Sequence, residues 1–323
     1  MAVRRESWAF REIDRYGARV VLPSSEAVVL FCQRRDALRV AEHARRSMGQ
    51  TWFDEVWNGL EAEHVGESYS KLCATTVDVE VADLIAADVQ RSFLSCDWDA
   101  ERLPLDALRC ALAEILRAFA AFNRTIGYCQ GMAAVVSQLL VLRCSGAGDA
   151  AEGSLRSAPS ASVVESVFSL LVALAAPEKT NFEALWSLDM RGVVASTAAL
   201  ERWLVLRRPQ LAAHLVDNLG VDLPSLTTKW FVTAFADVLA TSPALLLYTA
   251  RRWACERKAR RGGAALAGAR QSSSVEIAFA LLSVLRVELL AARDIEGVMQ
   301  VTFMYFPLRT FRANPPHTLT RPP

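Results

Sequence analysis

The chain has 323 residues, of which 52% are hydrophobic and 22% are charged, a composition typical of folded rather than disordered proteins. Its formal net charge is +1, so the sequence lacks the basic excess that nucleic-acid-binding domains carry. Composition and charge therefore predict a globular protein that does not bind nucleic acid.

The 7 cysteines and 4 histidines are scattered along the chain, and no two cysteines form a Cys-x-x-Cys pair. We therefore expect reduced thiols that are mostly packed as small apolar groups, and neither a disulfide framework nor a metal site. The N-terminal residues lack the apolar core of a signal peptide, and polar or charged residues interrupt the longest apolar stretches. These features predict a cytoplasmic protein without a transmembrane segment.

Apolar residues recur at steps of three and four along much of the chain, which is the pattern of amphipathic helices. The clearest such stretches cover residues 106–122, 163–174, 230–239 and 275–289. Two-residue alternation, the pattern of strands, is rare. The predicted fold class is all-α, with one helical domain and flexible insertions. Trp186, Trp203, Trp230 and Trp253 lie among helical apolar positions and are expected in the core.

Two insertions, 145–162 and 260–274, are rich in Gly, Ser and Ala and are expected to form surface loops inside this domain. We expect the domain to cover residues 51–292. Residues 1–50 are expected to be an N-terminal extension of unknown role. Residues 293–323 are expected to be a C-terminal segment with a disordered, proline-rich tail.

Sequence motifs that bind nucleotide phosphates, such as Gly-x-x-x-x-Gly-Lys-Ser/Thr and Gly-x-Gly-x-x-Gly, are absent from the sequence. The serine-hydrolase elbow, the zinc-protease motif and the kinase signatures are absent as well. If the protein promotes a reaction, most of the reacting site is therefore expected on a partner.

The first segment with candidate chemistry reads Ile85-Ala-Ala-Asp88-Val-Gln-Arg91. Helical spacing places Ile85, Asp88 and Arg91 on one face, so the carboxylate lies one turn before the guanidinium and can hold it extended. An ordinary exposed ion pair is the alternative interpretation of this spacing.

The second segment reads Gly127-Tyr128-Cys129-Gln130-Gly131-Met132, between an amphipathic stretch and an apolar one. Glycine at both ends permits tight turns and close backbone approach, so that Gln130 can be presented from an apolar surface. The alternative is a loop whose glutamine caps the end of a neighbouring helix.

Together the two segments resemble the TBC domain, the Rab GTPase-activating fold. Ile85, Asp88 and Arg91 match the family's first motif, Ile-x-x-Asp-x-x-Arg, and residues 127–132 match its second, Tyr-x-Gln-Gly-Met with a preceding Gly. A weaker similarity covers Trp230-Phe231, Pro243 and Arg252-Trp253. The resemblance extends over roughly residues 52–290.

The resemblance implies a GTPase-activating protein for a GTP-bound Rab small GTPase, acting in vesicle trafficking and intracellular protein transport. Arg91 would be an arginine finger and Gln130 a glutamine finger, both supplied in trans. The supporting residues would be Asp88, Tyr128, Gly127 and Gly131. The chain would need no cofactor of its own, because GTP and magnesium belong to the partner.

The sequence departs from the family at several positions. Ser92-Phe93-Leu94 stands where the family has Thr-Phe-Pro, Ala133 where it commonly has Asn, and Ala254 where it has Asp. These changes keep two alternatives open: a catalytically weak TBC fold that binds a Rab as an effector or scaffold, and a helical scaffold without GTPase contact. The basic stretch 251–261 has two interpretations. We favour a solvated helix end, and the alternative is peripheral contact with acidic endomembrane lipid.

Overall fold

The computed structural model describes residues 53–93, 104–144, 158–236, 250, 254 and 273–304. Every regular element in these ranges is helical, which confirms the all-α fold class for this part of the chain. Both predicted insertions lie mostly outside it, as do the N-terminal extension and the proline-rich tail. Residues 161 and 162 belong to a helix instead, because the Ser160 hydroxyl caps it by accepting from the Val163 amide at 3.4 Å.

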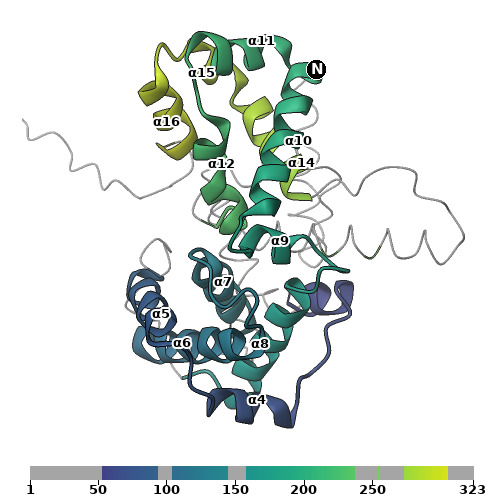
Figure 1. The fold of residues 1–323 in the computed structure, drawn as a ribbon, viewed down its shortest axis with the longest axis vertical. Coiled ribbons are helices and arrows are strands. Elements are labelled where there is room, and N and C mark those ends of the chain that lie inside the picture. The colour runs from purple at the N-terminus through teal and green to yellow at the C-terminus, as the bar shows by residue number, and fades with distance from the viewer. Residues whose placement is uncertain are drawn as a thin grey trace, which may run out of the picture.

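The first half of the described chain forms one group of helices, drawn purple to teal in the lower part of Figure 1. After a short helical segment at 53–59, the group consists of α4 (Glu67–Cys73), α5 (Val79–Arg91), α6 (Leu105–Phe122), α7 (Met132–Cys144) and α8 (Ala161–Leu174). Helix α6 packs against α4, α5, α7 and α8, and is therefore the centre of the group.

A second group lies above the first in Figure 1, and its central helix α10 packs against α9, α11, α12 and α14. Its α-helices are α9 (Phe182–Trp186), α10 (Arg191–Arg207), α11 (Pro209–Ala212), α12 (Leu223–Val232), α14 (Ser273–Val284), α15 (Arg286–Ala291) and α16 (Ile295–Met304). A π-helical turn, η1 (Ala213–Asn218), follows α11.

Helix α6 shows how the sequence pattern produces the core. Its apolar residues at three- and four-residue steps are all buried. They are Leu108, Leu112, Ile115, Leu116 and Phe119. Burying each such side chain contributes about 1.5–3 kcal/mol. The predicted helix at 106–122 is confirmed with one more residue at its start.

Helix α12 overlaps the predicted stretch 230–239 only at its last three residues, 230–232. It ends at Val232, and the Phe235 amide then donates to the Trp230 carbonyl at 2.7 Å, while the Ala234 amide donates to the Phe231 carbonyl at 3.3 Å. This pair of bonds is a Schellman motif, and Ala234 has the left-handed φ of +49° that the motif requires. Glycine usually takes that position, so an alanine there does not indicate that the helix stops.

The predicted helix at 275–289 is divided into α14 and α15. Leu285 separates them with φ −81° and ψ 8°, a ψ far from the helical value. The break redirects the chain so that α15 packs against α11 and η1. The expected domain boundaries at 51 and 292 stay predictions, although α16 packs on α15 and adds Val298 to the core.

The tryptophans expected in the core divide into three cases. Trp186 and Trp230 are fully buried. Trp203 is partly buried, with the Arg207 guanidinium 4.4 Å from its ring centre. Trp253 lies outside the described residues.

The described cysteines carry free thiols, but Cys73 and Cys110 are exposed rather than packed in the core as expected. Cys129 and Cys144 are partly buried against it.

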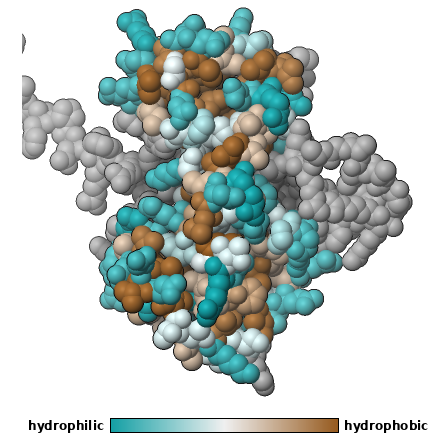
Figure 2. Space-filling model, in the orientation of Figure 1, coloured by the Kyte–Doolittle hydropathy of each residue, from teal (hydrophilic) through white to brown (hydrophobic). Residues whose placement is uncertain are grey.

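On the face shown in Figure 2, polar and apolar side chains are interspersed, and apolar patches occur on both groups of helices. Leu188 and Leu206 are the most exposed of the large apolar residues. In the described ranges, no helix combines the length and hydrophobicity that crossing a lipid bilayer requires.

Candidate functional site

Helix α5 places Asp88 and Arg91 one turn apart at its C-terminal end. Ile85, on the same face, is fully buried, and Asp88 is only 6% exposed. Arg91 is the last residue of the helix, and its side chain is 58% exposed. Arg91 Nη2 donates a hydrogen bond to Asp88 Oδ1. The arrangement therefore presents a guanidinium to solvent while a buried carboxylate restrains it.

The residue after the arginine supports the same turn. The Ser92 hydroxyl donates to the Asp88 carbonyl at 2.8 Å, and the chain then leaves the helix in an extended conformation. Serine stands where the family usually has threonine, and like threonine it carries a hydroxyl.

Residues 127–131, here called the Gln130 loop, lie between α6 and α7 and directly precede α7. The Gly127 amide donates to the Asn123 carbonyl at 2.8 Å, and Gly127 has a left-handed φ of +59°. Glycine adopts this conformation without the strain that a Cβ would bring. Gln130 is exposed at the far end of the loop.

Tyr128 connects the Gln130 loop to α5. Its ring is buried, and its hydroxyl donates to Asp88 Oδ2, while Asp88 Oδ1 accepts from Arg91. One buried carboxylate thus bonds to both segments that the sequence singled out. The structure brings Asp88, Arg91 and Tyr128 together, with Gln130 two residues beyond the tyrosine.

Burial determines the protonation of the side chains in this loop. Burial, followed by the hydrogen bond to Asp88, raises the pKa of Tyr128, so its hydroxyl remains a donor at neutral pH. Burial and the nearby Asp88 charge raise the pKa of Cys129 to about 11. The Cys129 thiol is therefore neutral and is not an activated nucleophile.

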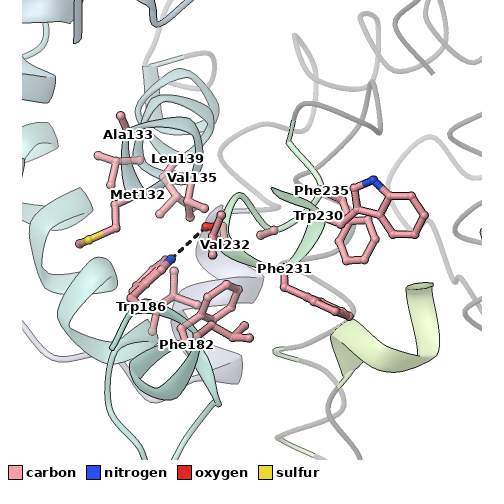
Figure 3. Packing of buried hydrophobic residues seen from close by; sticks show 14 of the residues in the cluster. Met132, Ala133, Val135, Leu139, Phe182, Trp186, Trp230, Phe231, Val232 and Phe235 are labelled. Carbon is pink, nitrogen blue, oxygen red and sulfur yellow. Dashed lines mark hydrogen bonds between the residues drawn. The ribbon is translucent and has the colours of Figure 1, made fainter. Parts of the chain in front are cut away.

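Gly131 closes the loop against the second group of helices. It has φ +116°, and a Cβ there would lie 2.9 Å from the Val232 carbonyl oxygen, at the end of α12. The Trp186 Nε1–H donates to that oxygen at 2.9 Å (Figure 3). From its sequence position Trp186 was expected only in the core, because no local pattern relates residue 186 to residues 131 and 232.

Helix α7 begins directly after the loop. The Ala134 amide donates to the Gly131 carbonyl at 3.1 Å, and Met132 is fully buried. Ala133 is buried too, so the position where the family commonly has Asn adds a methyl group to the core (Figure 3). The loop is therefore fixed at both ends, with Gln130 exposed between them.

The arrangement offers a permanently charged hydrogen-bond donor at Arg91 and a carboxamide at Gln130. Within the described ranges, no cluster of three or more His, Cys, Asp or Glu side chains is suited to a metal ion. Pro243, Arg252 and Trp253 of the weaker third motif lie outside the described residues. Ala254 is partly buried.

Two curated relatives are similar to this chain. TBC domain-containing protein C4G8.04 of Schizosaccharomyces pombe is 26% identical over 194 residues, which cover 58% of this chain and 22% of that protein. TBC1 domain family member 30 of Homo sapiens is 24% identical over 244 residues, which cover 68% of this chain and 24% of that protein. The chain thus spans about a quarter of the length of these relatives.

A solved structure and a family model complete the comparison. The crystal structure of the Chlamydomonas flagellar RabGAP TBC domain matches with a TM-score of 0.55 and 18% identity, over 95% of this chain and 88% of that one. At this identity the match shows the fold. The model of the Rab-GTPase-TBC domain matches residues 55–249, more than half of the chain. The chain therefore belongs to the Rab-GTPase-TBC domain family.

Proposed function

We propose that this protein accelerates GTP hydrolysis on a GTP-bound Rab small GTPase by supplying Arg91 and Gln130 in trans. The observation that carries the proposal is the shared contact at Asp88. Its buried carboxylate bonds to Arg91 on α5 and to Tyr128 in the Gln130 loop. Hydrogen bonds to Asp88 thus join the two motifs of the family, each of which carries an exposed polar side chain, Arg91 or Gln130.

Arg91 is suited to stabilise a transferring phosphoryl group. GTP hydrolysis passes through a transition state whose negative charge is spread over phosphate oxygens, and an arginine supplied in trans accelerates it by about 10³–10⁵-fold. A guanidinium has five N–H donors, so a bond to Asp88 leaves donors for phosphate oxygens. The Asp88 carboxylate would limit the freedom of Arg91 before the partner binds.

Gln130 is suited to orient the attacking water, because a carboxamide both donates and accepts hydrogen bonds. Its position just before α7 also favours negative charge nearby, since a helix N-terminus carries a partial positive charge. GTP and Mg²⁺ would come from the GTPase, in line with the absence of a phosphate-binding motif in this sequence. Action on a Rab would place the protein in the cytoplasm, at endomembranes, in vesicle trafficking.

A second candidate function is Rab binding without acceleration. Ala133 is buried and carries no polar group, so the support that Asn commonly gives in the family is missing next to the Gln130 loop. A protein that holds the GTPase but orients the water poorly would act as an effector or scaffold.

Single-turnover GTP hydrolysis across a panel of Rab proteins tests the proposal. The wild-type protein is expected to accelerate hydrolysis on at least one Rab, and Gln130→Ala is expected to slow that reaction at saturating protein. Binding to GTP-loaded Rab without acceleration would establish the second candidate. If the protein neither binds any Rab nor accelerates its GTP hydrolysis, the remaining interpretation is a helical scaffold without GTPase contact.

A further inference from the structure

The end of α12 has a carbonyl with an unusual partner. Val232 is the last residue of the helix, and carbonyls in a last helical turn lack partners within the helix. The Val232 oxygen accepts from the indole Nε1–H of Trp186 at 2.9 Å, and both residues are buried. A side chain of α9 therefore satisfies and orients the terminal peptide group of α12.

The same carbonyl lies against the Gln130 loop. A Cβ at Gly131 would come within 2.9 Å of the Val232 oxygen, 3.1 Å of its carbonyl carbon and 3.1 Å of its side chain. The loop backbone therefore packs directly on the peptide group that Trp186 holds. Figure 3 shows the bond from Trp186 to the Val232 carbonyl and labels Met132, the residue after Gly131.

We infer that Trp186 is a positioning residue for Gln130, acting through Val232 and Gly131. The inference rests on the proposed function, because it concerns the placement of the proposed glutamine finger. Without the indole N–H, the buried Val232 oxygen loses its partner and the end of α12 can reorient. Gly131 would then shift, and Gln130, its neighbour in the chain, with it. A displacement of about 1 Å in a reacting group can cost up to about 10²-fold in rate.

Trp230 provides a matched control for a substitution of Trp186. Both indoles are buried in the same core cluster. Trp230 Nε1 is buried without a hydrogen-bond partner among the described residues. Trp186→Phe and Trp230→Phe therefore remove the same volume, but only the first removes a hydrogen bond that orients the Val232 carbonyl.

The kinetic test measures single-turnover hydrolysis on a responsive Rab while the concentration of this protein is varied. Trp186→Phe is expected to lower the maximal rate about tenfold and to change the half-saturating concentration less than twofold. Trp230→Phe is expected to keep the maximal rate within twofold of wild type. In a Gln130→Ala background, Trp186→Phe should lower the maximal rate no further, because the effect is transmitted through Gln130.

Hydrogen–deuterium exchange gives a readout that does not depend on GTPase activity. Peptides that cover residues 127–134 should exchange faster in Trp186→Phe than in Trp230→Phe or wild type, whereas those in the middle of α6 should not. Replacement of Trp186 by 3-benzothienylalanine, which has sulfur in place of Nε1–H, repeats the test with the shape retained. If Trp186→Phe does not fold because the phenylalanine ring is smaller, the benzothienylalanine variant still tests the role of the N–H group.

Equal exchange at residues 127–134 in the wild type, the Trp186 variants and Trp230→Phe would overturn the inference, as would equal maximal rates. If the wild type accelerates hydrolysis on no Rab, the proposed function fails instead, and the exchange measurement alone decides whether Trp186 positions the loop.

Discussion

Tyr128 and Asp88 are 40 residues apart in the sequence, yet the tyrosine hydroxyl donates directly to the buried aspartate carboxylate. The other oxygen of that carboxylate accepts from Arg91. The conformation of the Gln130 loop is therefore coupled to the arginine on α5 through a single side chain. Changes at Tyr128 should affect both the stability of the fold and the activity of the site.

Replacing Tyr128 with phenylalanine tests this coupling. The change leaves Asp88 Oδ2 buried without the hydroxyl, so we expect the free energy of unfolding in urea to fall by about 1–3 kcal/mol. We also expect a lower maximal rate of stimulated GTP hydrolysis, because the Gln130 loop loses its bond to α5.

Tyr69→Phe is the matched control. Tyr69 also donates to a carboxylate, Glu114 Oε1 at 2.7 Å, but it connects α4 to α6 outside the site. We expect this variant to lose stability while its stimulated hydrolysis stays close to wild type. Equal losses of activity in the two variants would argue against a specific role for Tyr128.

The two glycines of the Gln130 loop should differ in their tolerance of alanine. Gly127 has a left-handed φ but open space around it, so Gly127→Ala should cost only the backbone strain, about 1–2 kcal/mol of unfolding free energy. Gly131→Ala should cost more, because its Cβ would also approach the Val232 carbonyl oxygen to 2.9 Å. Thermal and urea unfolding of both variants measure the difference. A smaller loss for Gly131→Ala would contradict the packing described for Val232.

The Cys129 thiol should titrate at unusually high pH. Its folded pKa is raised from 9.0 to about 11, so the stability that comes from keeping the thiol neutral is complete below pH 9 and is lost as pH rises toward 11. Iodoacetamide labelling of Cys129, followed by mass spectrometry, should therefore show a midpoint near pH 11 in the folded protein. The urea-unfolded chain should label with a midpoint near 9.0, and the same midpoint in the folded protein would refute the assigned burial.

Local sequence patterns predicted much of the first group of helices. The apolar spacing of α6 sufficed because its buried residues follow the helical period without interruption. The spacing of Ile85, Asp88 and Arg91 likewise placed them on one face of α5. The partner of Tyr128 could not be predicted in this way, since a contact between residues 40 apart depends on how α5 and the Gln130 loop pack.

The errors of prediction arose where tertiary packing overrides local preference. Ala234 adopts a left-handed conformation that the sequence does not indicate, and it ends α12 earlier than expected. Leu285 breaks an apolar stretch with a good helical pattern, and α15 consequently packs on α11 and η1. The contact of Trp186 with Val232 has no local sequence signal at all, because a buried tryptophan is usually explained by packing alone.

The most direct test of the proposed activity replaces each of two exposed arginines of this protein and measures GTP hydrolysis on the same responsive Rab. Arg91 and Arg191 each pair with a carboxylate, Asp88 and Glu183, and their side chains are 58% and 51% exposed. At saturating protein, Arg91→Ala should lower the single-turnover rate of GTP hydrolysis by about 10³-fold or more, whereas Arg191→Ala should remain within about twofold of wild type. Equal rates for Arg91→Ala and wild type would contradict the assignment of Arg91 as the residue that stabilises the transferring phosphoryl group.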